Sequence, residues 1–302
     1  MKNGRPFLAM VLLLAAQVSI VHAQAEKALG AATVPPKILL LVRQQFKFGS
    51  EGTRQSLETR IARACNHLDV PNSWIDLQSI TGPLEAFSFD PFDSFEHVEN
   101  AYVVWAQFYA AHPDLGHLQE QVRALETSES TIIAVRRDDL GYRVNRIDLS
   151  KAHFMRVLEV QLRPGHEGEF VESFKLLSTA YEKIDADMPW VVYQVNVGMP
   201  SPAFLVFVPM RGLKENDAYL ARGAKLREAE GDAGYDRMQQ IARDAFVSTE
   251  SDLYAISPEM SHVPKEIIDG DPDFWLSKPL ASAKAAPALG REESALAADR
   301  KP

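Results

Sequence analysis

An internal repeat constrains the fold of this chain more than any other feature of its sequence. When the 302-residue sequence is displaced by 116 positions against itself, a long stretch aligns without a gap. The coincident pairs are Gly49 with Gly165, Glu51 with Glu167, Gly52 with Gly168, Trp74 with Trp190, Gln78 with Gln194 and Gly82 with Gly198. Because this spacing persists through strand-like, turn-like and helix-like segments, the sequence predicts two copies of one folded unit.

Each copy shows the same order of predicted elements: strand, helix, strand, strand, helix, strand. The long second helix is expected over 93–126, with a break at Pro113, and over 213–246, with a break near Gly231. The predicted strands are 37–46, 74–80, 86–90 and 131–135 in the first copy and 153–162, 190–197, 203–209 and 252–256 in the second. This order predicts an α+β fold of tandem ferredoxin-like repeats.

The N-terminus has the pattern of an export signal. Residues 1–23 combine Lys2 and Arg5 with an apolar stretch and end in small residues at Val21 and Ala23. The apolar stretch is short for a membrane span of about 20 residues. We therefore expect cleavage, no stable membrane insertion afterwards and a periplasmic or secreted protein, with an uncleaved anchor as the alternative.

The rest of the chain divides around the two copies. The predicted segments are a flexible lead-in at 24–36, the first repeat at 37–136, a linker at 137–150, the second repeat at 151–256, a packed extension at 257–276 and a disordered tail at 277–302. Within the linker, residues 142–147 alternate enough to predict a short extra strand.

Composition excludes some classes of function. The net charge is −9, which disfavours general binding to nucleic acid or to anionic membranes, because phosphate binding relies on basic patches. The single cysteine, Cys65, rules out an intramolecular disulfide framework and a cysteine-based metal cluster. Its place on the apolar stripe of a predicted helix favours a core residue over a nucleophile.

A strand followed by Arg-Pro-Gly-His-Glu-Gly-Glu-Phe at 163–170, opening a helix, resembles the dimeric α/β-barrel superfamily. That superfamily includes the antibiotic-biosynthesis-type monooxygenases, haem-degrading monooxygenases and the NIPSNAP proteins. The resemblance covers roughly 37–256 and extends to exported bacterial proteins with two such domains. It implies two four-stranded sheets closing into one barrel, here within a single chain, so we expect a monomer with a pseudo-dimeric barrel or a homodimer. It also implies ligand pockets inside the barrel or between sheet and helices.

Strand alternation groups the candidate ligand-binding residues into two sets. Trp74 and Gln78 share one face of their strand, and Trp190, Gln194 and Asn196 share the matching face in the second copy. On the first strands, Arg43 and Glu159 occupy equivalent positions and could pair across the pseudo-twofold axis. These residues either form a polar network that holds the halves in register or line a pocket in which the indoles stack on a flat ligand.

The sequence contains no recurring catalytic constellation. The histidines suit no regular metal pair, so no metal and no cofactor is expected; haem ligation among His97, His112 and His117 is the alternative to surface or capping roles. Three functions stay open at this point: binding of a small apolar or aromatic molecule in the barrel, a monooxygenase-like enzyme, and a non-catalytic structural or interaction module. We favour the first, and leave open whether the protein is an enzyme.

Overall fold

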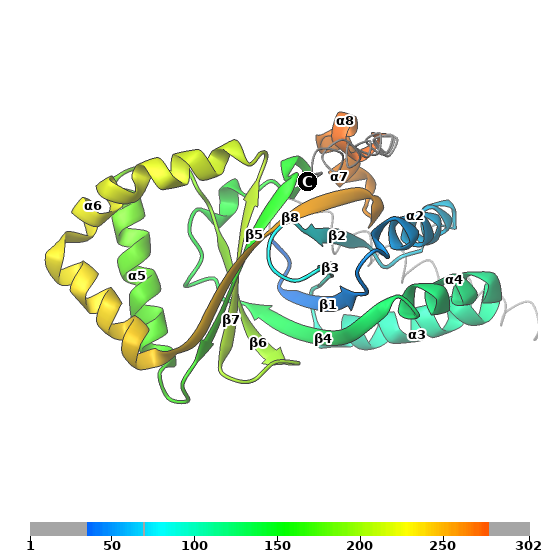
Figure 1. Ribbon diagram of the computed structural model, residues 1–302, viewed down its shortest axis with the longest axis horizontal. Helices are drawn as coiled ribbons and strands as arrows, with labels where there is room; N and C mark the ends of the chain where they lie inside the picture. The colour runs from blue at the N-terminus through cyan, green and yellow to red at the C-terminus, as the bar shows by residue number, and fades with distance from the viewer. Residues whose placement is uncertain (1–34, 69, 278–302) are drawn as a thin grey trace, which may run out of the picture.

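A closed antiparallel barrel of eight strands lies at the centre of the molecule, with one layer of helices on each of two sides (Figure 1). The computed structural model describes residues 35–68 and 70–277. The predicted signal peptide, most of the lead-in and nearly all of the predicted tail lie outside the described residues.

The first half runs through seven elements in the predicted order. They are β1 (Ile38–Phe46), α2 (Glu51–His67), β2 (Trp74–Ser79), β3 (Glu85–Phe92), α3 (Phe95–Ala111), α4 (Pro113–Arg123) and β4 (Glu126–Arg136). The predicted break in the long helix is confirmed: α3 ends at Ala111, and α4 begins at Pro113, whose missing N–H is harmless in a first helical turn.

The second half repeats this order, with one long helix in place of two. Its elements are β5 (Phe154–Leu162), α5 (Glu167–Lys183), β6 (Val191–Val197), β7 (Ala203–Met210), α6 (Lys214–Ala245) and β8 (Phe246–His262). The break expected near Gly231 is confirmed, because its φ of 71° is non-helical within α6. β1 and β5, like α2 and α5, are 116 positions apart.

The strand order around the barrel is β1-β3-β2-β8-β5-β7-β6-β4. Each half contributes a sheet of four neighbouring strands, and the halves join where β2 pairs with β8 and β4 pairs with β6. The predicted α+β fold is therefore confirmed: tandem ferredoxin-like repeats form a dimeric α/β barrel within one chain.

The linker differs from the expectation of a short strand at 142–147. Tyr142 forms only an isolated bridge with Trp190, and Val144–Arg146 is a single 3-10 turn, followed by a second at Leu149–Lys151. The physical reason is the left-handed backbone of Arg143 (φ 46°), which ends the extended conformation directly after Tyr142.

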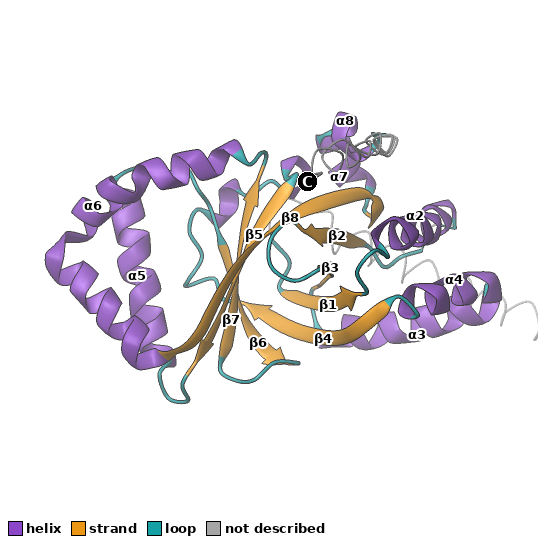
Figure 2. Cartoon of the chain, viewed as in Figure 1, coloured by secondary structure: helices purple, strands orange, loops and turns teal. Residues whose placement is uncertain are grey.

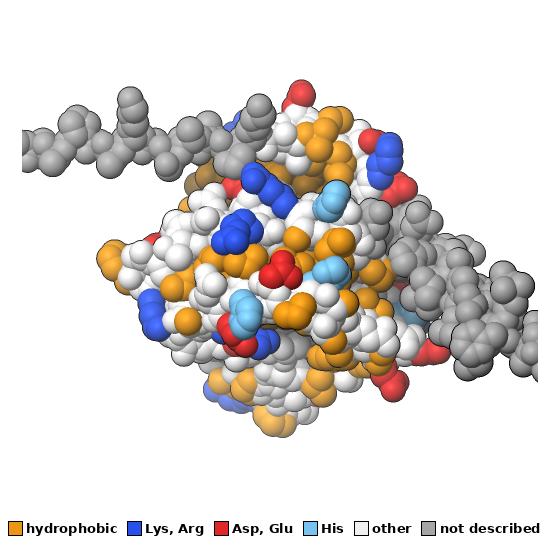
Figure 3. Space-filling view, turned by 90° about the vertical axis from the view of Figure 1, so that its right-hand side faces the viewer, with side chains coloured by type: hydrophobic (Ala, Val, Ile, Leu, Met, Phe, Trp, Pro, Cys, Tyr) orange, Lys and Arg blue, Asp and Glu red, His pale blue; other side chains and the backbone are white. Residues whose placement is uncertain are grey.

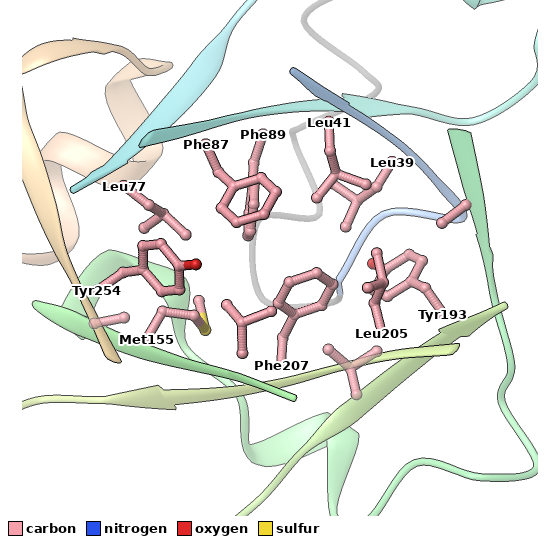
Figure 4. Packing of buried hydrophobic residues seen from close by; sticks show 14 of the residues in the cluster. Leu39, Leu41, Leu77, Phe87, Phe89, Met155, Tyr193, Leu205, Phe207 and Tyr254 are labelled. Atoms are coloured by element: carbon pink, nitrogen blue, oxygen red, sulfur yellow. The ribbon is translucent and has the colours of Figure 1, made fainter. Parts of the chain in front are cut away.

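The barrel interior is filled at its centre by side chains from both halves (Figure 4). Phe89 from β3 meets Phe207 from β7 at 4.9 Å between ring centroids, and Phe87 meets Tyr254 from β8 at 5.4 Å. Leu41, Leu77 and Leu205 fill the space between them and are almost completely buried. The space that remains, about 70 Å³, lies towards one end near Pro36, Tyr193 and Val263.

A short C-terminal segment packs against the barrel core. It contains α7 (Lys265–Gly270) and α8 (Pro272–Trp275), seen at the top of Figure 2. Ile267 and Trp275 are buried, and the Trp275 indole donates a hydrogen bond to the carbonyl of Ser150 at 2.7 Å. Across the described residues, no helix combines the length and the apolar character that a membrane span requires.

Candidate functional site

A cavity of about 360 Å³ lies between the first-half sheet and its helices α2, α3 and α4. Side chains alternate across a strand, so every second residue of β1, β2 and β3 faces these helices. The sheet wall consists of Leu40, Val42, Gln44, Trp74, Asp76, Ser88, Asp90, Phe92, Glu129, Thr131 and Met260. The helix wall consists of Glu58, Ile61, Val98, Ala101, Tyr102, Trp105, Tyr109, Gln119 and Arg123. Figure 3 shows the molecule from this side, where hydrophobic and charged side chains intermingle.

Aromatic rings make up one part of this wall. Trp74 and Trp105 meet at 5.9 Å between ring centroids, and Trp105 stacks on Tyr109 at 5.7 Å. The Trp74 indole nitrogen donates to the carbonyl of Met260 on β8 at 2.7 Å, which fixes the plane of the ring. Burial raises the pKa of Tyr109 to about 12, so this phenol is neutral at physiological pH.

A buried arginine organises the acidic part of the wall. Arg54 on α2 binds Glu58 through two hydrogen bonds, of 2.9 and 2.6 Å, and Asp76 at 3.1 Å. Its guanidinium also lies 4.3 Å from the ring centroid of Phe46. Gln78 accepts a hydrogen bond from Arg54 and donates one to Asp76, which closes the network.

The two carboxyl groups that share Arg54 differ from ordinary surface acids. Burial, followed by repulsion from Asp76, raises the pKa of Glu58 to about 8. Burial also raises the pKa of Asp76, although Arg54 and Gln78 oppose this shift. One cation between two buried carboxyls neutralises one charge, so the pair holds a proton near neutral pH.

Asp90, on β3, faces the cavity without a cationic partner. Its only hydrogen bond among the described residues comes from the Ser88 hydroxyl at 2.7 Å, and no ion pair in this part of the chain includes it. Burial raises the pKa of Asp90 to about 7, against the Ser88 hydrogen bond, which lowers it. A carboxyl group that titrates near neutral pH beside a cavity is typical of a functional position.

A second acidic group lies at the β4 side of the cavity. Gln44 donates to Glu126 at 2.7 Å and to Glu129 at 3.4 Å. Burial, then the neighbouring Glu129 charge, raises the pKa of Glu126. Arg123 is the cation on the cavity wall, and it is solvent-exposed.

Arg43 and Glu159 lie inside the barrel, away from this cavity. The pairing suggested by the repeat is present: Arg43 Nη1 lies 3.0 Å from Glu159 Oε1, across the boundary between the halves. Arg43 also binds Glu85 through Nε at 2.9 Å and Nη2 at 3.0 Å, and the Tyr254 hydroxyl donates to Glu85 at 2.6 Å. Burial raises the pKa of Glu159 and Arg43 opposes the shift. These contacts make a polar plug at one end of the filled interior.

The second-half candidates occupy different surroundings from their first-half counterparts. Trp190 is buried, stacks on Tyr142 at 4.7 Å and donates to the carbonyl of Leu140 at 3.0 Å. Gln194 accepts a hydrogen bond from Arg137 at 2.8 Å, and Asn196 is exposed. Of the candidates, only Trp74 is on the wall of the 360 Å³ cavity, with Gln78 one contact behind it.

The equivalent space in the second half is filled by aromatic and aliphatic side chains. Phe170 stacks on Phe204 at 4.1 Å and touches Phe174 at 4.6 Å, and Tyr181 meets Trp190 edge-on at 5.0 Å. These residues belong to one continuous buried cluster with Val160, Val192, Val206 and Val208.

The histidines and Cys65 have structural surroundings in the described chain. His117 pairs with Glu120 on the surface, and His153 binds Asp271 at 2.9 Å. Burial raises the pKa of Cys65 to about 12, which keeps it an inert thiol. Within 35–68 and 70–277, no group of three His, Cys, Asp or Glu side chains is placed to hold a metal ion.

Arg54, Glu58 and Asp90 were not among the site residues predicted from the sequence. A signal for two of them was present in the repeat itself: at the 116-residue offset, Arg54 coincides with Phe170 and Glu58 with Phe174. Asp90 was harder to find, because β3 and β7 are displaced by 118 positions when matched through their pairing with β1 and β5.

Comparisons with known proteins give distant structural matches. No protein-family model matches the chain, and no curated protein matches it. An anthrone oxidase-like protein is 12% identical, with 73% of this chain and 91% of that chain covered and a TM-score of 0.48. A chlorite dismutase variant from Candidatus Nitrospira defluvii is 11% identical, with 81% and 97% covered and a TM-score of 0.46. A haem-binding protein from Thermus thermophilus is 10% identical, with 74% and 91% covered and a TM-score of 0.38. Similarity at this level carries no information about the ligand or reaction of this chain.

Proposed function

We propose that this protein binds a small aromatic molecule in the cavity between the first-half sheet and helices α2, α3 and α4. The observation that carries the proposal is the cavity itself: about 360 Å³, with Trp74, Trp105 and Tyr109 on its wall and Asp90 facing it. Ligand sites of this size typically combine an apolar, aromatic lining with a few convergent polar groups.

The location differs from the sequence-based hypothesis of a ligand inside the barrel. The barrel centre is filled by Phe87, Phe89 and Phe207, and the space left at one end is about 70 Å³. An apolar cavity of roughly 150 Å³ is large enough to bind benzene. The helix–sheet cavity exceeds that volume and the barrel interior does not, so the helix–sheet cavity is the better candidate.

The test is isothermal titration calorimetry with three aromatic probes of similar size: 2-phenylethylamine, 2-phenylethanol and 3-phenylpropionate. The critical variant is Ala101→Trp, because Ala101 on α3 is buried at the cavity wall and a tryptophan there fills the space. We expect wild-type protein to bind at least one probe and Ala101→Trp to lose that binding.

The control variant is Leu220→Trp, which adds the same side chain at an exposed position on α6 in the other half. It should bind like the wild type. Failure of all three probes to bind, or equal binding by Ala101→Trp, would show the proposal to be wrong. Native mass spectrometry of the protein from its own source, with an ultraviolet-visible spectrum, tests in addition for a bound molecule.

We further propose that this binding takes place outside the cytoplasm. The support is the signal-peptide pattern of residues 1–23, with Lys2 and Arg5 ahead of an apolar stretch. Expression of the full chain in bacteria, followed by fractionation and N-terminal sequencing, tests this. Mature protein beginning after Ala23 in the periplasm or medium is the expected result, and full-length protein in the cytoplasm would contradict it.

A further inference from the structure

We propose that the cavity of the first half selects a protonated amine: the aromatic part of the ligand packs against Trp74 and Trp105, and the Asp90 carboxylate binds its ammonium group. This inference rests on the proposed function and adds the charge of the ligand to it.

The charges on the cavity wall favour a cation. The acidic lining residues are Glu58, Asp76, Asp90 and Glu129, whereas the basic lining residue is Arg123. Arg54, behind the wall, balances one charge of the Glu58–Asp76 pair, and the proton that the pair holds near neutral pH balances the other. The negative charge left for a ligand therefore belongs to Asp90 and Glu129. The chain as a whole carries a net charge of −9. An anionic ligand entering this cavity would lose its hydration opposite carboxylates, which is unfavourable.

Asp90 is the carboxyl group with capacity left for a ligand. Glu58 and Asp76 are occupied by Arg54 and Gln78. Asp90 accepts a hydrogen bond only from Ser88 Oγ among the described residues, through its Oδ1 atom. A carboxylate accepts several hydrogen bonds, and those from a charged donor are roughly twice as strong as neutral ones. An ammonium group is such a donor.

The aromatic lining supports the same charge. Trp74, Tyr102, Trp105 and Tyr109 all border the cavity. The faces of such rings carry partial negative charge, so several rings around a small volume attract a cation, and tryptophan does so best. Carboxylate and rings therefore select the same ligand class, an aromatic amine carrying one positive charge. The described residues supply no three-ligand set that would instead favour a metal ion.

The second half shows that this lining is not a requirement of the fold. Strand pairing places Val208 at the position of Asp90, and Val206 at that of Ser88. The 116-residue repeat places Val192 at the position of Asp76. The same barrel is thus built with a mainly apolar layer on its other side, where Arg156, at the position of Leu40, is a polar exception on the strands. That layer holds no carboxyl group at the positions of Asp76 and Asp90, so the carboxyl groups of the first half need a reason other than folding.

The titration of Asp90 should also make the affinity for an amine depend on pH. The titratable or charged groups facing the same cavity are Glu58 on α2, Asp76 on β2, Glu129 on β4, Tyr102 and Tyr109 on α3 and Arg123 on α4. The pKa of Asp90 is about 7 in the free protein. Because an ammonium group binds the ionised carboxylate, affinity for an amine should rise as pH increases through 7 and then level off.

The experiment compares 2-phenylethylamine with its neutral analogue 2-phenylethanol by calorimetry at pH 6 and pH 8. We expect the wild type to prefer the amine by about tenfold or more at pH 8, since hydrogen bonds to charged groups are worth more than neutral ones. Asp90→Asn should remove most of this preference while retaining the alcohol. Glu129→Gln, which removes one charge at the exposed side of the cavity, should change it by no more than about threefold.

A second variant tests the pH effect independently of charge removal. Ser88→Ala deletes the hydrogen bond that lowers the Asp90 pKa, so the midpoint of the pH dependence should move to higher pH. Equal affinity for the amine and the alcohol, or amine affinity that falls as pH rises from 6 to 8, would overturn the inference. Binding of the alcohol alone would do the same and leave the proposed function intact, whereas failure of every probe would remove both.

Discussion

The two halves of this barrel share one architecture and differ in the layer between sheet and helices. The first half holds polar residues there and contains a cavity that is partly open to solvent, and the second half holds mainly apolar residues and is filled. The matched positions, first half then second, are Arg54 and Phe170, Glu58 and Phe174, Gln44 and Val160, Asp76 and Val192, Ser88 and Val206, and Asp90 and Val208.

This difference indicates which half of the duplicated fold contributes more to stability and which half contains the candidate site. Buried polar groups lower stability unless they are paired, whereas close-packed aromatic side chains raise it. The second half therefore contributes a close-packed layer, and the first half keeps an open, partly charged layer. Trp74 and Trp190, which first revealed the repeat, take opposite roles: Trp74 borders the cavity and Trp190 is core.

The largest effect is expected from truncating the filled layer. Phe170 is completely buried and contacts the rings of Phe174, Phe204 and Phe246. Phe170→Ala should lower the free energy of unfolding by about 4 kcal/mol, because it leaves an unfilled cavity in a packed core. In the open half, Trp105→Ala should cost only about 1–2 kcal/mol, since this ring already borders empty space. Denaturant unfolding measures both, and equal losses would contradict the comparison.

The next effect concerns the joint between the halves. Arg43→Ala leaves Glu85 and Glu159 facing each other in a buried place without their cation. We expect a loss of about 3 kcal/mol at pH 7. Glu159→Gln should cost less, because Arg43 keeps both of its hydrogen bonds to Glu85. The loss in Arg43→Ala should shrink when unfolding is measured near pH 4, because burial raises the pKa of Glu159 and this carboxyl group binds a proton there. An equal loss at both pH values would show that the charge is not its cause.

The sequence predicted this joint, and the barrel around it, for a simple physical reason. Strand alternation and a fixed repeat place Arg43 and Glu159 at equivalent sites, and closure about a pseudo-twofold axis brings together equivalent sites that lie close to that axis. The cavity could not be predicted in the same way, because periodicity shows which residues share a face but not how well a helix fills it. The residues that distinguish the cavity from the filled layer, such as Glu58 and Phe174, are those at which the two copies differ. A repeat is recognised by the positions that are the same, so it gives no signal for these residues.

Stability as a function of pH should also distinguish the halves, through Asp90. Its pKa is raised from 3.8 to about 7, so the folded protein holds this proton more tightly than the unfolded chain. The contribution is fully present below pH 4 and is lost as pH rises to about 7. Asp90→Asn removes this dependence. The full shift corresponds to about 4 kcal/mol. Because the Asp90 side chain is only half-buried, solvent screening reduces the expected gain relative to wild type to roughly 2 kcal/mol between pH 4 and pH 8. Unfolding curves at both pH values provide the measurement. A constant difference between the two proteins would rule out the raised pKa.

The smallest effect comes from Gln78 and Gln194, one of the amide pairs that the repeat preserves. Gln78 connects Arg54 and Asp76 in the buried network of the first half. Gln194, its counterpart, accepts a single hydrogen bond from Arg137 at 2.8 Å, and that arginine keeps its ion pair with Asp139 without it.

Gln78→Ala should therefore cost roughly 1–2 kcal/mol, because it leaves buried charged groups with fewer partners. Gln194→Ala should cost less than about 0.5 kcal/mol, as is usual for substitutions away from buried networks. Denaturant unfolding of both variants measures the difference. If the two losses are equal, glutamine is present at both positions because it stabilises both halves in the same way. If only Gln78 matters, the amide is kept in the first half because the charges around the cavity require it.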